Sequence, residues 1–294
     1  MSQAGGPRVK LNTGYEIPLV GFGTYKVTGN EGLDVAVDAA LKAGYRHFDT
    51  AKFYVNEPEL GASLEKLLPK HGLKREDVFI TTKLWPAKEN NTEVTVNLVN
   101  ESLANFKTDY VDLVLIHYPK SNDKENEDPT NKQDRKDLWL ALEKLHKAGQ
   151  IRSIGVSNYE VRHLKEIPEY SSTVPAVNQL EYHPHFRRQD IKDYCKEHGI
   201  FFQAFSSLAR YEPALINDPL VNELAKKYNT SIEQVLLSFA TSQNVGIVPK
   251  STNPGRIEAN FQVVNFKLSD EDVEKLNNIN VDKHYIRCTG WLVQ

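Results

Sequence analysis

Four side chains that could move or stabilise a proton stand at or just after the ends of short apolar runs. Asp49, Lys83 and His117 each end such a run, and Tyr54 follows in the loop after Asp49. Taken singly, Asp49 could begin a turn, Lys83 could be solvated and His117 could be a hydrogen-bonded core histidine. Together, a phenol, an ammonium, a carboxylate and an imidazole could protonate an oxygen on which negative charge develops.

The elements that must position these residues follow from the pattern of apolar runs. Short runs rich in β-branched and aromatic residues alternate with amphipathic stretches of helical period. The run 111–116 is almost continuously apolar, which suits a parallel strand covered on both faces. The predicted strands are 19–23, 47–49, 78–83, 111–117, 153–157, 176–181, 201–206 and 246–249. The predicted helices are 31–43, 57–68, 93–106, 136–148, 188–198 and 232–243.

Strict alternation of strand and helix predicts a parallel sheet. Eight units without an obvious break favour closure into a single (β/α)8 TIM barrel covering residues 1–294, and an open doubly wound sheet is the alternative. A β-hairpin at residues 9–18 is predicted before the barrel, around an Asn-Thr-Gly turn. Because barrel enzymes place their chemistry at the carboxyl ends of the strands, the four reactive side chains are expected on one face, among variable loops.

The segment after the last apolar run has the residues of a phosphate site. Asn253 is a favourable N-cap and Pro254 a favourable first residue, so a short helix is predicted to begin here. Barrels often bind phosphate at the N-terminus of such an extra helix. Lys250, Ser251 and Arg256 would bring two cations and a hydroxyl to it, and the alternative is a solvated basic loop.

Composition excludes several other classes of protein. With 36 basic and 39 acidic residues the formal charge is −3, which gives no electrostatic case for binding nucleic acid. No stretch approaches the roughly 20 apolar residues that span a bilayer, and the first ten residues lack a signal-peptide core. Two reduced cysteines, Cys195 and Cys288, are expected in a cytoplasmic protein, with one disulfide as the alternative. His183 and His185 could suggest a metal pair, but no third ligand cluster accompanies them, and no metal is predicted.

Beyond these single features, the chain resembles the aldo-keto reductase family along most of its length. The resemblance rests on several motifs that keep the family's order in the chain. These are residues 44–51 with Glu57 and Leu60-Gly61, then 115–119, 155–159, 178–184, and 249–251 with Arg256 and Asn260. The resemblance implies a catalytic tetrad of Asp49, Tyr54, Lys83 and His117, with Tyr54 as the general acid. A nearby ammonium is expected to lower the pKa of Tyr54.

The resemblance also implies a cofactor and a substrate pocket. The cofactor would be NADPH, with its 2′-phosphate held by Lys250, Ser251 and Arg256 and its carboxamide by Ser157, Asn158 and Gln179. The remaining expected cofactor contacts are Thr24, Phe205, Ser206, Leu208, Thr252 and Asn260. The expected substrate contacts are Tyr25, Trp85, Tyr118 and Trp291. The substrate would be a small carbonyl compound bound by a monomer.

Five departures from the family pattern affect details. Phe205 stands where the family usually has a tyrosine, and Ala259 where it usually has a glutamate that binds adenine. Tyr25 and Tyr118 replace frequent tryptophans, which predicts a roomier and more polar pocket. The loop 206–211 is short, so looser cofactor binding is expected. The sequence leaves open a specialised prostaglandin or quinone reductase, and a non-catalytic regulatory or crystallin-like barrel that binds NADPH.

Overall fold

The computed structural model describes residues 5–294, in which eight parallel strands lie side by side in chain order. The strands are β3 (Phe22–Gly23), β4 (His47–Asp49), β5 (Phe79–Leu84), β6 (Val111–Ile116), β7 (Ile151–Ser157), β8 (Val177–Glu181), β9 (Phe201–Phe205) and β10 (Gly246–Ile247). Parallel bridges Val20–Ile247 and Gly23–Lys250 join the first strand to the last. The sheet is therefore closed, which confirms the predicted (β/α)8 fold and excludes the open sheet.

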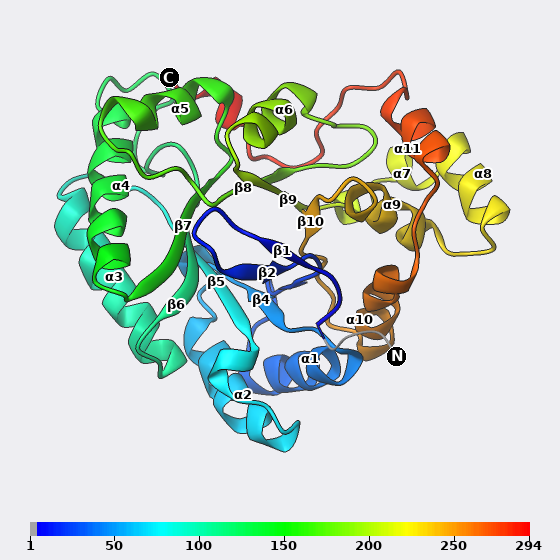
Figure 1. The fold of residues 1–294 in the computed structure, drawn as a ribbon, viewed down its shortest axis with the longest axis horizontal. Coiled ribbons are helices and arrows are strands. Elements are labelled where there is room, and N and C mark those ends of the chain that lie inside the picture. The colour runs from blue at the N-terminus through cyan, green and yellow to red at the C-terminus, as the bar shows by residue number, and fades with distance from the viewer. Residues whose placement is uncertain (1–4) are drawn as a thin grey trace.

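Helices form a ring outside the strands (Figure 1). They are α1 (Asn30–Ala43), α2 (Glu57–Lys70), α3 (Asn91–Phe106), α4 (Asn131–Lys147), α5 (Val161–Glu166), α6 (Gln189–Glu197), α7 (Pro213–Ile216), α8 (Pro219–Lys227), α9 (Ile232–Thr241), α10 (Pro254–Phe261) and α11 (Asp270–Asn277). The six predicted amphipathic helices and the short helix at Pro254 are confirmed, with ends that differ by a few residues. Sequence reasoning missed α5, α7, α8 and α11, each of nine residues or fewer.

The hairpin of β1 (Arg8–Lys10) and β2 (Glu16–Pro18) lies across the centre of the ring (Figure 1). Ile17 is fully buried there, in one apolar cluster with Phe79, Val177 and Phe201. These three residues begin their strands, so the hairpin closes the amino-terminal end of the barrel. Only the carboxyl-terminal end remains for a site.

Helix α1 illustrates how the sequence produces these elements. Leu33, Val37 and Leu41 recur every four residues and are buried against the barrel; each such side chain contributes about 1.5–3 kcal/mol when removed from water. Gly44 ends the helix with φ 111°. A Cβ at that position would also lie 2.7 Å from the ring of Phe261, so the turn requires glycine.

The first and last strands are shorter than predicted. Residues 19–21 contact the last strand through the Val20 bridge and single hydrogen bonds rather than through a continuous ladder. Pro249 has no N–H to donate, which is consistent with β10 ending at Ile247. Among the helices of residues 5–294, none is both long and apolar enough to cross a bilayer.

Candidate active site

A pocket of about 390 Å³ opens at the carboxyl ends of the strands, opposite the hairpin. Three members of the predicted tetrad line it directly, and the fourth, Lys83, lies beneath it with no exposed surface. The predicted residues that line the pocket are Tyr25, Asp49, Tyr54, Trp85, His117, Ser157, Asn158, Gln179, Phe205, Ser206, Leu208 and Lys250. Residues at or just after the ends of all eight strands thus meet on one face, as the barrel fold predicts.

Lys83 connects the polar members of the tetrad. Its Nζ donates to Asp49 Oδ1 at 2.6 Å, to the Thr50 carbonyl oxygen at 3.0 Å and to Tyr54 Oη at 3.4 Å. The ring of His117 lies edge-on to that of Tyr54, with centroids 5.8 Å apart. Hydrogen bonds thus join the carboxylate, the ammonium and the phenol, and the imidazole lies beside the phenol.

Burial controls the protonation of Tyr54. It raises the pKa of the phenol well above its usual value, and the Asp49 carboxylate raises it further. The expected lowering of this pKa is wrong for this structure, because burial outweighs the attraction between Lys83 and a phenolate. The charge of Lys83 is largely neutralised by Asp49 at 2.6 Å, so the loss of hydration dominates. Tyr54 is consequently a protonated phenol at neutral pH.

Burial also determines the states of Lys83 and His117. It lowers the pKa of Lys83, and the Asp49 carboxylate opposes that shift. It lowers the pKa of His117 well below the usual value, and the Lys83 ammonium lowers it further. The imidazole is therefore neutral. Its Nδ1 is buried and finds no hydrogen-bond partner within residues 5–294.

Three polar side chains at the ends of β7 and β8 form an amide cluster beside the tetrad. Asn158 Nδ2 donates to the His117 carbonyl oxygen at 2.9 Å and to Ser157 Oγ at 3.1 Å. Gln179 Nε2 donates to Asp49 Oδ2 at 2.9 Å and to Gln203 Oε1 at 2.7 Å. Each amide nitrogen carries two protons, and both are used within the protein. The two amides therefore have only their carbonyl oxygens to offer a ligand, and Asn158 and Gln179 are both residues of the pocket lining.

The predicted phosphate segment lies beside the pocket. Asn253 Oδ1 accepts from the Arg256 backbone N–H at 3.0 Å, which confirms the predicted N-cap of α10. Lys250 lines the pocket, and the Arg256 side chain is exposed. Thr252 is also exposed, while Ser251 is buried and donates to the Asn253 carbonyl oxygen at 3.5 Å.

Two predicted cofactor residues are buried away from the pocket wall. Thr24 has no exposed surface, and its hydroxyl donates to the Asp49 carbonyl oxygen at 3.0 Å. Asn260 is 6% exposed in the last turn of α10. In this structure Thr24 supports the backbone of a tetrad residue rather than facing the pocket.

Of the four aromatic residues predicted to contact a substrate, Tyr25 and Trp85 line the pocket, and the other two do not. Tyr25 packs against Tyr54 with ring centroids 5.0 Å apart, and Trp85 lies 5.5 Å from His117. Tyr118 is stacked behind Trp85 at 5.0 Å and does not reach the pocket lining. Trp291 lies outside the lining as well, where it packs on Phe186 at 5.6 Å and beneath the Arg188 guanidinium. Sequence position alone did not indicate which aromatic residues these two would meet.

Several lining residues were missed by sequence reasoning. They are Gly23, Phe53, Ser207, Arg210, Tyr211, Val248, Pro249, Ile286 and Cys288. Ile286 and Cys288 come from the carboxyl-terminal segment, whose backbone N–H groups at Tyr285 and Ile286 donate to the Glu181 carboxylate at 2.7 and 3.2 Å. In the sequence, the signal for this contact was Glu181, a glutamate at the end of a predicted strand. Both cysteines are free, and Cys195 is buried.

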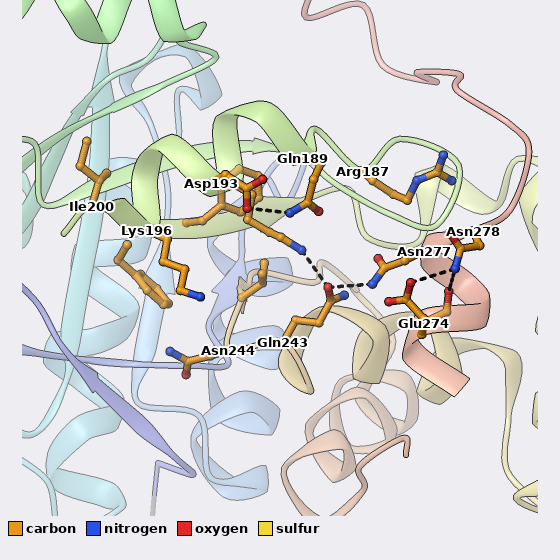
Figure 2. A pocket seen from close by; sticks show the side chains of 14 residues that line it. Arg187, Gln189, Asp193, Lys196, Ile200, Gln243, Asn244, Glu274, Asn277 and Asn278 are labelled. Carbon is orange, nitrogen blue, oxygen red and sulfur yellow. Dashed lines mark hydrogen bonds between the residues drawn. The ribbon is translucent and has the colours of Figure 1, made fainter. Parts of the chain in front are cut away.

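A second, larger groove of about 800 Å³ lies outside the barrel beside α6 (Figure 2). Its polar side chains bond mainly to one another: Gln243 Oε1 accepts from Lys192 at 2.8 Å and from Asn277 at 3.3 Å. None of the predicted site residues lines this groove. The histidines of the suggested metal pair are hydrogen-bonded elsewhere, His183 to Glu181 and His185 to Asp218, at 3.0 and 3.1 Å.

Comparison with known proteins agrees with this geometry. The sequence pattern of the Aldo/keto reductase family matches residues 19–281. Glyoxal reductase of Bacillus subtilis is 39% identical, over 94% of this chain and 93% of its own. Glycerol 2-dehydrogenase (NADP(+)) of Saccharomyces cerevisiae is 36% identical, over 94% of this chain and 92% of its own. An aldo-keto reductase from a Medee basin deep-sea metagenome, MGS-M4, has a similar structure with a TM-score of 0.84, at 34% identity over 94% and 96% of the chains.

These likenesses extend along the whole barrel and identify the family. The chain belongs to the aldo/keto reductase family and is an oxidoreductase of that family, whose members act on carbonyl compounds.

Proposed function

We propose that this protein reduces aldehyde or ketone carbonyls to alcohols with NADPH, and that Tyr54 is the proton donor. The observation that carries the proposal is the phenol of Tyr54, kept protonated by burial and 3.4 Å from the Lys83 ammonium at the edge of a pocket. When bound, the reduced nicotinamide supplies the hydride for the carbonyl carbon. The residues of this chain have to position the carbonyl and protonate its oxygen.

Each tetrad residue has a distinct part in that protonation. Tyr54 Oη gives its proton to the oxygen as negative charge develops there. The phenolate that results lies beside Lys83 Nζ, and attraction to the ammonium lowers the cost of forming it. Asp49 keeps Lys83 charged and in place at 2.6 Å despite burial. The neutral His117 can donate one ring N–H that orients the substrate oxygen.

The amide cluster fits the nicotinamide end of the cofactor. Asn158 and Gln179 can offer the pocket two acceptors and no amide donor, because their N–H groups are bonded within the protein. A primary carboxamide has an NH₂ group that suits two acceptors, whereas a carboxylate would be repelled. Phe205, which also lines the pocket, offers its ring face for stacking on nicotinamide.

The mouth of the pocket fits the phosphate groups. Lys26, in the loop after β3, lies 5.5 Å from the centroid of the Tyr25 ring, and Arg210, in the loop after β9, lies 5.7 Å from it. Burial lowers the pKa of Lys250, and the charge of Lys26 lowers it further, so cations crowd here. A pyrophosphate would relieve that repulsion. Arg256 at the start of α10 is proposed to hold the 2′-phosphate, because its planar fork matches a phosphate dianion.

The test uses purified protein, NADPH or NADH, and a panel of aldehydes, ketones and quinones, with dinucleotide oxidation followed by absorbance. NADPH consumption with several aldehydes supports the proposal and ranks substrates. Tyr54→Phe should bind NADPH normally by fluorescence quenching and lose at least about 100-fold in kcat, since general acid catalysis contributes that much. Tight NADPH binding without turnover of any compound would favour a regulatory or structural barrel instead.

A further inference from the structure

A buried glutamine on β9 lies under the amide cluster. Gln203 has no exposed surface, and its Cα is paired in register with that of Gln179 on the neighbouring strand. It shares a face of β9 with Phe205, two residues on, so its side chain points into the barrel. No motif in the sequence singled it out.

Gln203 completes the hydrogen bonding of Gln179. The Gln179 side chain reaches across the barrel from β8 to Asp49 on β4, where Nε2 donates to Oδ2 at 2.9 Å. The second proton on Nε2 is donated to Gln203 Oε1 at 2.7 Å. Within residues 5–294, the Nε2 of Gln203 has no partner, so this residue serves the network as an acceptor only.

These bonds fix which way the Gln179 amide faces. If the amide were reversed, its oxygen would lie against the Asp49 carboxylate, and two acceptors would oppose each other. With Nε2 held by Asp49 and Gln203, Oε1 is the only group that Gln179 can offer to the pocket. The same bond to Asp49 Oδ2 leaves Oδ1 for Lys83. One amide therefore links the cofactor end of the pocket to the tetrad.

We propose that Gln203 is a positioning residue for both parts of the site. By accepting the second proton of Gln179, it keeps Gln179 Oε1 directed at a ligand NH₂ group and Gln179 Nε2 on Asp49. Gln203 thereby makes the pocket select a carboxamide over a carboxylate on the pyridine ring. This inference rests on the proposed use of a nicotinamide dinucleotide.

The experiment compares the affinity of NADP⁺ with that of its nicotinic acid analogue, which carries a carboxylate in place of the carboxamide. Binding is followed by quenching of tryptophan fluorescence, so no turnover is needed. Gln203→Leu keeps the volume and removes the acceptor; Gln203→Glu keeps an acceptor, because a buried carboxyl is held neutral. Gln243→Leu is the control, since the side-chain oxygen of Gln243 also accepts a hydrogen bond but lies in the outer groove (Figure 2).

In the wild type, NADP⁺ should bind at least tenfold more tightly than the analogue. Gln203→Leu should lower this preference about tenfold, mainly by weakening NADP⁺ binding, whereas Gln203→Glu should remain within about threefold of the wild type. Gln243→Leu should change stability but not the preference. An unchanged preference in Gln203→Leu, with only a lower unfolding midpoint, would overturn the positioning role. A wild type that binds neither dinucleotide would instead contradict the proposed function itself.

Discussion

Replacing Lys83 with methionine should separate the stability of the barrel from its chemistry. Lys83 has no exposed surface, and its ammonium is paired with the Asp49 carboxylate at 2.6 Å. Methionine fills a similar volume but leaves Asp49 as a buried anion without its cation. Asp49→Asn combined with Lys83→Met removes both charges, and the asparagine can still accept from Gln179. The single and double variants therefore differ mainly in one uncompensated charge.

The size of the effect follows from that burial. Removing one partner of a buried ion pair costs about 3–5 kcal/mol, because the remaining charge has lost its hydration. The unfolding entropy is about 2.1 cal/mol/K per residue, or ~0.6 kcal/mol/K for 294 residues. Dividing the lost stability by this entropy predicts that the single variant melts roughly 5–8 °C lower than the wild type. The neutral double variant should recover most of this loss. Both should lose roughly 100-fold or more in kcat, because neither can stabilise the phenolate of Tyr54.

The assay combines thermal unfolding by circular dichroism with NADPH oxidation at saturating aldehyde. Dinucleotide affinity is measured for each variant, so that lost binding is not mistaken for lost catalysis. Two results would refute the reasoning. One is a Lys83→Met variant destabilised by less than about 1 kcal/mol, as expected of an exposed pair. The other is a double variant that regains wild-type kcat, since no ammonium would then be required beside Tyr54.

Three further predictions concern other parts of the chain. Arg256→Ala should weaken NADPH binding about 10- to 100-fold and leave NADH nearly unchanged, since charged hydrogen bonds contribute ~1.5–3 kcal/mol; equal losses for both dinucleotides would exclude the 2′-phosphate role. Asn253→Ala should cost ~1 kcal/mol in urea unfolding by removing the N-cap of α10, and a neutral result would mean that the cap is redundant. Burial lowers the pKa of His163 to about 3 from 6.5. Between these two pH values His163 is protonated in the unfolded chain but neutral in the folded chain, so the free energy of unfolding should fall as pH drops from about 6.5 toward 3. At pH 5 the loss is about 2 kcal/mol, and His163→Gln should flatten that part of the stability curve by the same amount; an unchanged slope would show that other groups cause it.

Local pattern was sufficient to predict most of the fold. Continuous apolar runs such as that of β6 and the helical period of α1 depend only on neighbours in the chain, and both elements lie where the pattern placed them. The same holds for the N-cap at Asn253, whose hydrogen bond spans three residues. The tetrad could be located because the carboxyl ends of parallel strands share one face in any closed barrel.

Contacts between distant segments were decided only by the tertiary structure. Tyr54 was expected to have a lowered pKa, but the burial that raises it comes from the enclosing pocket and not from adjacent residues. Trp291 could not be placed from its sequence position, because its packing depends on where the carboxyl-terminal segment crosses the loops near Phe186. Gln203 gave no sequence signal, since its role depends on Gln179 reaching Asp49, 130 residues away, across a closed barrel. Which side chains meet across that interior depends on the register and closure of all eight strands, and no local pattern contains that information.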